Sequence, residues 1–371
     1  MKETSKLIGA VSQAEPVICG GVRMKILFTV ASMAGGGAER VISILAECLV
    51  KQEHQVTIIM TAGDKVDYQL APGIKVVSIG GTTGGSMIKR FKRIERLHAL
   101  FRQNRDAVII SFGLGTNFYT AAAHLGLKNR LVISERNDPA ACPHPHFRNM
   151  IFNHADKIVF QTQDALRCFP RKIQKKGAVI PNPVSDINAL PYEGERKKTI
   201  VAVGRLEPQK NYPILLKAFA AFHKKHADYT LHIFGRGYLH DELQKLSLDL
   251  AVAESVVFEG YTQNVHEKIL DAGMYVLSSD YEGISNALLE AMALGLPVIA
   301  TDCPIGGSKL CITHGKDGLL VPVGDVKSME YAMSRIADDD KFARAIGREA
   351  VKVRQRFSVE TVMEEWNRVL I

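Results

Sequence analysis

The sequence predicts an α/β protein with two domains, each built on a doubly wound parallel β-sheet. The chain has 371 residues, which is long enough for two domains. Short apolar segments alternate with helix-forming segments, as in sheets whose strands are joined by helices. The alternation is interrupted by the polar stretch 185–198 and starts again with the apolar run that begins at Thr199. These observations place a domain boundary near residue 190.

The expected organisation follows from these breaks. Residues 1–23 form an extension with little apolar character, and Met24 opens the first strand. The first domain is expected over 24–190 and the second over 199–356. The intervening 191–198 is polar and contains Pro191 and Gly194, which suits a linker.

Composition limits the class of protein. Hydrophobic residues make up 46% of the chain and charged residues 23%, and no apolar run reaches the length of a membrane span. The six cysteines show no framework spacing, which suits a reducing cytoplasm. The net charge is +8, which favours an acidic partner such as phosphates, nucleic acid or an anionic membrane.

A basic segment, Lys89–Arg102, carries much of the positive charge. Its apolar residues recur at helical spacing with lysine and arginine between them. A helix packed on its sheet with a solvated basic face explains this pattern, and so does a helix resting on anionic lipid; one helix can do both. Nucleic-acid binding is disfavoured, because no basic patch with interleaved aromatic residues is present.

The most informative stretch lies at 276–301 and reads as strand, loop, helix and strand. Ser285 is the expected N-cap of a helix that begins at Asn286, and Gly283 lets the backbone approach closely. The unpaired N–H groups at this helix start favour an anion, most often a phosphate. Glu282 and Glu290 lie on either side of that position and can accept hydrogen bonds from sugar hydroxyls. A surface helix with an exposed glutamate remains the alternative.

Two further loops suit phosphate binding. The apolar strand at 199–204 ends in a loop with Arg205 and Lys210, which can bind a diphosphate unless they form only surface ion pairs. Gly36 and Gly37 lie between the first strand and a helix, where backbone N–H groups can face an anion or simply form a tight turn.

Metal binding is disfavoured. Cys142, His144, His146 and His154 include zinc-ligand residue types, but no second ligand pair accompanies them and prolines make the segment a loop.

Two motifs carry a family resemblance. Glu282, seven intervening residues and Glu290, followed by Ala-Leu-Gly-Leu-Pro-Val, resemble the signature of retaining family-4 glycosyltransferases with the GT-B fold. The run Gly-Arg-Leu-x-x-x-Lys-Asn at 204–211 resembles the second signature of that family. The similarity covers most of the chain from Met24 and is strongest over 199–325.

The resemblance implies two facing Rossmann-like domains with a deep cleft between them, and a C-terminal helix, 357–371, that packs back on the first domain. It implies that Arg205 and Lys210 stabilise the leaving diphosphate, that Glu282 positions the transferred sugar and that Glu290 holds the ribose. No metal or cofactor is implied. The expected donor contacts are completed by Gly283, Ile284, Ser285, Asn286, Gly36, Gly37, Gly235 and Tyr261. The expected acceptor side comprises Asn117, Arg136 and Asn137, at the carboxyl ends of first-domain strands.

This chain departs from the family pattern at Arg136, where many relatives have histidine, and at Lys309, where relatives usually have an acidic residue. The implied activity is transfer of a hexose or N-acetylhexosamine, with retention, from a nucleotide sugar to a lipid-linked or glycan acceptor in polysaccharide biosynthesis. A UDP-sugar is the favoured donor. The expected location is the cytoplasm, peripheral on the inner face of the membrane. A GT-B nucleotide-sugar epimerase and a transferase with a soluble acceptor remain alternatives.

Overall fold

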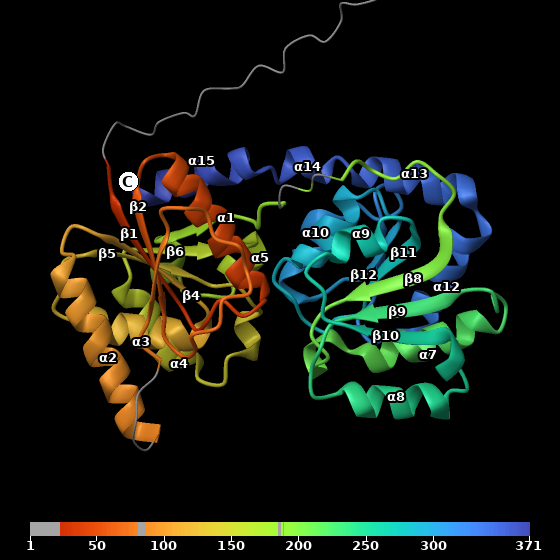
Figure 1. Ribbon diagram of the computed structural model, residues 1–371, viewed down its shortest axis with the longest axis horizontal. Coiled ribbons are helices and arrows are strands. Elements are labelled where there is room, and N and C mark those ends of the chain that lie inside the picture. The colour runs from red at the N-terminus through yellow and green to blue at the C-terminus, as the bar shows by residue number, and fades with distance from the viewer. Residues whose placement is uncertain (1–22, 81–85, 185–186, 188) are drawn as a thin grey trace, which may run out of the picture.

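The computed structural model describes residues 23–80, 86–184, 187 and 189–371. In this part of the chain two parallel sheets stand side by side, and helices cover both faces of each sheet (Figure 1). The expected α/β architecture with two parallel sheets is therefore confirmed. The predicted extension 1–23 lies outside the described residues, except for Arg23, which pairs with Glu53 at 2.8 Å.

The first sheet has, within the described residues, seven strands in the order β3-β2-β1-β4-β5-β6-β7, and every neighbouring pair is parallel. Its strands are β1 (Lys25–Val30), β2 (Gln55–Met60), β3 (Lys75–Ser78), β4 (Val108–Phe112), β5 (Arg130–Ser134), β6 (Lys157–Phe160) and β7 (Gly177–Val179). The helices between them are α1 (Gly37–Lys51), α2 (Ser86–Gln103), α3 (Leu114–His124), α4 (Pro145–His154), α5 (Gln163–Arg167) and α6 (Arg171–Gln174), with the 3₁₀ turn η1 (Pro139–Ala141).

The last helix, α15 (Val359–Leu370), lies on the first sheet although it follows the second sheet in sequence. Its side chains share an apolar cluster with α1 and with strands β1, β2 and β4. Trp366 stacks on Phe112 with ring centroids 5.9 Å apart and is 1% exposed. A large buried aromatic pair of this kind anchors the chain end to the first sheet.

The second sheet has six strands in the described part of the chain, in the order β10-β9-β8-β11-β12-β13, again all parallel. Its strands are β8 (Lys197–Val203), β9 (Thr230–Phe234), β10 (Val256–Gly260), β11 (Ala272–Leu277), β12 (Val298–Thr301) and β13 (Leu319–Val321). Its longer helices are α7 (Tyr212–His223), α8 (His240–Asp249), α10 (Asn286–Ala293), α12 (Val326–Asp338) and α13 (Asp340–Ala350). Shorter elements are α9 (Val265–Ile269), α11 (Gly307–Cys311), α14 (Val353–Arg356), η2 (Pro208–Lys210), η3 (Ala253–Ser255) and η4 (Pro304–Gly306).

The segment expected as a linker is bound to the second sheet. The guanidinium of Arg196 donates to the carbonyls of Leu270, Ala272 and Gly295. Strand β8 already begins at Lys197, before the expected start at Thr199.

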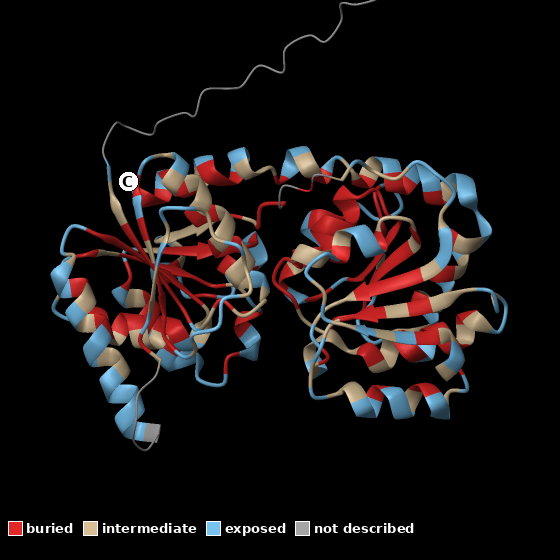
Figure 2. Ribbon diagram, in the orientation of Figure 1, coloured by how far each residue is buried: buried red, intermediate tan, exposed pale blue. Residues whose placement is uncertain are grey.

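Strand order places the ligand crevice. In the first sheet the order reverses between β1 and β4, and in the second between β8 and β11. Loops that leave neighbouring strands in opposite directions open a crevice at the carboxyl edge of a parallel sheet. The inner strands of both sheets are mostly buried, whereas the loops at these edges are partly open (Figure 2). The loops after β1, β8 and β11 are the ones that carry the predicted phosphate-binding residues.

Candidate functional site

A cleft of about 1920 Å³ lies between the carboxyl edges of the two sheets. Its walls come from both sheets, together with the starts of helices α1 and α10. The predicted site residues that line it are Gly36, Gly37, Arg136, Asn137, Arg205, Lys210, Gly235, Tyr261, Glu282, Ile284, Ser285, Asn286 and Glu290. Asn117 and Gly283 are the predicted residues that do not line it.

Lys210 and Glu282 form an ion pair beside the start of α10. Both side chains are largely buried, with 15% and 10% of their surfaces exposed. Ser279 donates a second hydrogen bond to the same Glu282 oxygen at 2.9 Å. Gly204 makes room for the lysine, because a Cβ at that position would lie 2.8 Å from Lys210 Cε. The loops after β8 and β11 thus place opposite charges together at the mouth of a helix.

The start of α10 is built as the sequence predicts. Ser285 Oγ accepts a hydrogen bond from the Leu288 amide at 3.4 Å, which is the expected N-cap. Across the cleft, α1 begins at Gly37 after Gly36, and no side chain caps this second helix start. Two helix N-termini therefore open into one cleft, and both favour negative charge there.

Arg205 lies at the edge of the same cleft and is 61% exposed on its side chain. It pairs with Glu207 at 3.0 Å, which is the surface ion pair weighed as the alternative. Its exposure leaves the guanidinium accessible to a ligand in the cleft. The structure therefore brings Arg205 to the site but gives it a contact different from that of Lys210.

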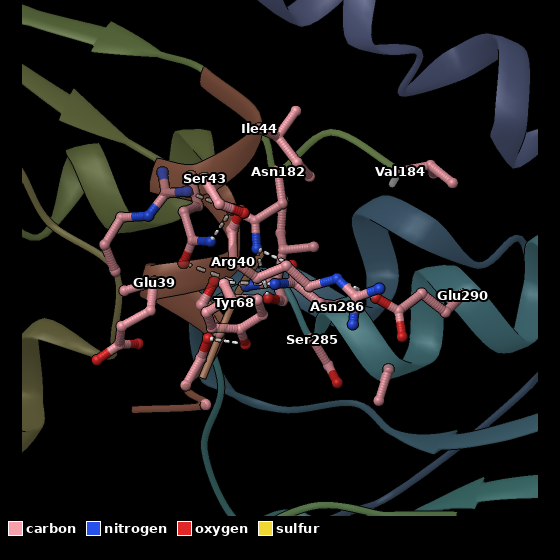
Figure 3. A pocket seen from close by; sticks show the side chains of 18 of the residues that line it. Glu39, Arg40, Ser43, Ile44, Tyr68, Asn182, Val184, Ser285, Asn286 and Glu290 are labelled. Carbon is pink, nitrogen blue, oxygen red and sulfur yellow. Dashed lines mark hydrogen bonds and ion pairs between the residues drawn. The ribbon is translucent and has the colours of Figure 1, made fainter. Parts of the chain in front are cut away.

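Glu290 is 4% exposed and has a partner from each domain. Its Oε1 lies 3.1 Å from Arg40 Nε in α1, and its Oε2 lies 2.9 Å from His266 Nε2 in α9. Figure 3 shows Arg40 reaching across the cleft toward this carboxylate. Sequence reasoning missed both partners. Arg40 follows the Gly-Gly loop closely, which was a usable signal, whereas nothing in the local sequence marks His266.

A network of buried amides joins the two domains beside α10. Asn182 donates to Ile284 O at 2.9 Å and to Asn286 Oδ1 at 2.6 Å, and it accepts hydrogen bonds from Gln161 and Arg136. Asn286 in turn donates to Gly37 O at 2.9 Å. Both amide residues of the first domain were absent from the predicted site.

Residues of the first domain cover the loop before α10. The Ile284 amide donates to Gln161 Oε1 at 3.2 Å, so this N–H is already used. A Cβ on Gly283 would lie 1.7 Å from Gln161 Oε1 and 2.6 Å from Arg136 O. The groups that lie closest to Gly283 in this structure therefore belong to the first domain.

Arg136 lies at the cleft wall beneath this network. Its guanidinium binds Asn182 and lies 5.2 Å from the ring centroid of Phe112. Burial lowers the pKa of Arg136 to about 9, so its side chain stays protonated at neutral pH. Asn137 is exposed at the same wall. Asn117, the third residue expected on the acceptor side, is instead fully buried and donates to Ser134 O at 3.3 Å, behind the wall.

Glu135, beside Arg136, gives a pH-dependent prediction. Its carboxylate is 6% exposed, and burial raises its pKa from 4.5 to about 7 despite nearby amides and Arg148. A raised folded-state pKa means that this group's contribution to stability is fully present below 4.5 and is lost as the pH rises through about 7. We expect Glu135→Gln to gain stability relative to the parent by about 3 kcal/mol between roughly pH 5 and pH 8. Thermal unfolding across that range measures the difference, and a difference that does not change with pH would contradict the prediction.

Gly235 and Tyr261 lie where the second sheet meets the cleft. Gly235 has φ of 145°, and a Cβ there would lie 1.9 Å from Gly204 O, so no other residue fits. Tyr261 is 41% exposed and lines the cleft, so it lies outside the core. Arg236, which was not predicted, lies over the Tyr261 ring at 4.7 Å and pairs with Asp67 of the first domain at 3.5 Å.

Within the described residues no group of three or more His, Cys, Asp or Glu side chains could hold a metal ion. Among the residues weighed for zinc, His154 has another contact, because its Nε2 lies 3.0 Å from Nδ1 of His124. His124 in turn contacts the Asn129 carbonyl at 2.7 Å.

Comparison with known proteins identifies the family. Residues 190–353 match the model of "Glycosyl transferases group 1", and residues 35–186 match that of "Glycosyltransferase Family 4". The two matches follow one another along the chain; the match over 35–186 includes strands β2 to β7, and the match over 190–353 includes all strands of the second sheet. The chain belongs to glycosyltransferase family 4.

Relatives and solved structures agree with this membership. The glycosyltransferase is 28% identical, over 94% of its length and 98% of the relative's, to an alpha-1,4-N-acetyl-D-galactosaminyltransferase of Campylobacter jejuni. That relative is named for a GalNAc-containing undecaprenol diphosphate. This chain is also 28% identical to a second N-acetylgalactosaminyltransferase of that organism, over 86% of the chain and 92% of the relative. This second relative is named for a diphospho-undecaprenol substrate.

The fold has solved counterparts. The Anabaena protein HepE, solved in complex with UDP and glucose, superposes with a TM-score of 0.81 at 19% identity, over 94% of this chain and 99% of HepE. The glycosyltransferase therefore has the GT-B fold expected from the sequence.

Proposed function

We propose that this glycosyltransferase moves a hexose or N-acetylhexosamine from a UDP-sugar, with retention of configuration, to a lipid-linked or glycan acceptor in polysaccharide biosynthesis. The observation that carries the proposal is the Lys210–Glu282 pair beside the start of α10, inside the cleft between the two sheets. A sugar nucleotide needs positive charge at its diphosphate and a hydrogen-bond acceptor at its sugar, and this arrangement offers both within one loop pair.

The reaction requires stabilisation of the diphosphate as it leaves. Lys210, Arg205 and the N-termini of α10 and α1 supply positive charge and N–H donors in the cleft. Glu282 positions the sugar through its hydroxyls, and Glu290 holds the ribose. Lys210 already binds Glu282, so the lysine joins the sugar-binding carboxylate to the diphosphate that it neutralises. Gly235 and Tyr261 border the place left for the base.

Retention without a metal follows from the same groups. Covalent double displacement uses a second catalytic carboxylate as nucleophile. Glu290 is taken up by the ribose in this proposal and contacts His266 of its own domain, so it is not available for that role. Same-face attack, in which an oxygen of the leaving phosphate takes the acceptor proton, needs only the charge stabilisation described above.

The donor and acceptor classes rest on relatives. The complex of HepE with UDP supports a uridine nucleotide, and the undecaprenol diphosphate substrates in the names of the two Campylobacter enzymes support a lipid-linked acceptor. Thermal-shift screening against UDP-, GDP- and ADP-sugars tests the donor, since a ligand bound by the folded state raises its stability. Transfer in the presence of EDTA tests metal independence, and NMR of the product anomer tests retention. Stabilisation by none of the nucleotide sugars would contradict the proposal.

We further propose that α2 rests on anionic lipid at the inner face of the membrane. No helix among the described residues is long and apolar enough to cross a membrane. At the start of α2, however, Met87, Ile88 and Phe91 are 64%, 53% and 67% exposed, with exposed Lys89, Arg90 and Lys92 among them. Farther along, Leu97 and Phe101 are buried against the sheet. The helix thus packs at one end and presents apolar and basic groups together at the other.

Flotation with liposomes measures this contact. We expect binding to vesicles that contain anionic lipid and a loss of about tenfold or more in Ile88→Ser/Phe91→Ser, because each exposed apolar group adds burial energy at the interface. Leu248→Ser is the matched control, since Leu248 is equally open, at 67%, on α8 of the second domain. Binding that does not depend on anionic lipid would contradict the membrane contact.

A further inference from the structure

The carboxylate of Glu290 is held by one group from each side of the cleft. Its side chain is only 6% exposed, so it is almost completely enclosed by its neighbours. His266 belongs to the same domain as Glu290, whereas Arg40 comes from the other domain. In the proposed function this carboxylate accepts hydrogen bonds from the ribose. In this structure it is instead contacted by Arg40 and His266.

We propose that Arg40 and His266 control donor binding in opposite directions through Glu290. His266 is a positioning residue that orients the carboxylate for the ribose. Arg40 competes with the ribose for the same carboxylate and must leave before the donor is fully bound. This inference rests on the proposed function, because it takes Glu290 as the ribose-binding group.

His266 is placed to remain in contact when a donor enters. It lies in α9, which packs against α10, and its Nε2 is 2.9 Å from Oε2 of Glu290. Its side chain is 20% exposed. Helix packing within one domain fixes this geometry, so it does not depend on how the two domains are arranged. A hydrogen bond that fixes the carboxylate rotamer removes part of the ordering cost of binding a sugar.

Arg40 is placed to leave. Its Nε contacts Oε1 across the cleft at 3.1 Å, and its side chain is 27% exposed, compared with 6% for Glu290. A hydroxyl pair on the ribose needs acceptor lone pairs of this carboxylate, and Arg40 already contacts its Oε1 atom. Figure 3 shows the Arg40 side chain extended toward Glu290.

From its charge alone, Arg40 would be expected to strengthen the binding of UDP. Removal of a cation from a diphosphate-binding cleft normally weakens anion binding. The competition predicts that Arg40→Met tightens binding of UDP, by about tenfold for one charge-assisted contact that no longer has to be broken. The two accounts therefore differ in sign, which makes the measurement decisive.

Calorimetric titration with UDP tests both residues. We expect Arg40→Met to lower the Kd for UDP about tenfold and to leave the Kd for 2′,3′-dideoxy-UDP unchanged, because the dideoxy compound lacks the competing hydroxyls. His266→Ala should raise the Kd for UDP about tenfold, and His266→Gln should largely restore it, since the amide nitrogen can replace Nε2. Steady-state assays of His266→Ala should show the change in KM rather than in kcat.

Lys25→Met is the matched control for lost charge, because Lys25 pairs with Asp106 at 3.1 Å on the outer surface of the first domain. The Kd for UDP of Lys25→Met should equal that of the parent. Weaker binding of UDP in Arg40→Met, or an equal gain for the dideoxy compound, would overturn the competition. Glu290→Gln separates this failure from that of the proposed function: unchanged UDP binding in that variant removes the ribose role itself, whereas weakened binding there leaves only the role of Arg40 to be judged.

Discussion

Glu282→Gln is expected to lower kcat for sugar transfer about a thousandfold while the Kd for UDP changes little. The amide can still accept a hydrogen bond from a sugar hydroxyl, but it no longer pairs with Lys210 as an ion. The ionic link through Lys210 between the sugar-binding group and the leaving group is then lost. Steady-state transfer assays with UDP-sugars measure the effect on kcat, and calorimetric titration with UDP measures the effect on the Kd.

Two further variants make the Glu282 result interpretable. Breaking a buried ion pair can destabilise a protein, so Lys210→Met/Glu282→Leu, which replaces both charges, should fold well and remain inactive. Glu259→Gln is the control for loss of a carboxylate, because Glu259 pairs with His232 outside the cleft. Its activity should equal that of the parent. Full transfer activity in Glu282→Gln would remove Glu282 from the proposed site.

Gly283→Ala is expected to lower kcat about a hundredfold, because misplacement of a catalytic loop by about 1 Å has effects of this size. The new methyl group would meet Gln161 Oε1 at 1.7 Å and Arg136 O at 2.6 Å. The side chain can swing away, but the backbone carbonyl cannot, so the two domains must separate. Small-angle X-ray scattering should show a larger radius of gyration in the variant than in the parent.

The controls for Gly283→Ala use the same methyl group elsewhere. Gly115→Ala adds a Cβ that meets nothing within 4 Å, and its activity should not change. Gly283→Ala/Gln161→Ala removes the side-chain clash but keeps that with Arg136 O, so it should recover activity only in part. Complete recovery would mean that Gln161 alone sets the spacing, and unchanged activity in Gly283→Ala would mean that this closed arrangement is not used in catalysis.

Much of the architecture could be predicted because its signals are local. Ser285 is the N-cap of α10 as the sequence indicated, and strand order then brings the loops after β8 and β11 to one crevice. Lys210 and Glu282 are both in loops that directly follow apolar strands, so their meeting follows from the rule for parallel sheets.

Asn117 shows that a position near a strand end does not determine the direction of the side chain. It also follows an apolar strand, but it lies inside the first turn of α3 and points into the protein, where it binds Ser134 O. The sequence places a residue near a strand end, but the direction of its side chain depends on the packing of that helix against β5. Tyr261, which directly follows β10, does face the cleft.

The sequence by itself determined the two parallel sheets, the helix starts that favour phosphate and the carboxylates beside them, because periodicity, capping and strand-end position act over a few residues. Only the tertiary structure decided which groups meet across the cleft. Arg40 reaches Glu290, Gln161 takes the Ile284 amide, and Asn182 joins Arg136 to Asn286. The physical reason is that these contacts depend on the relative placement of two domains, which no local pattern encodes.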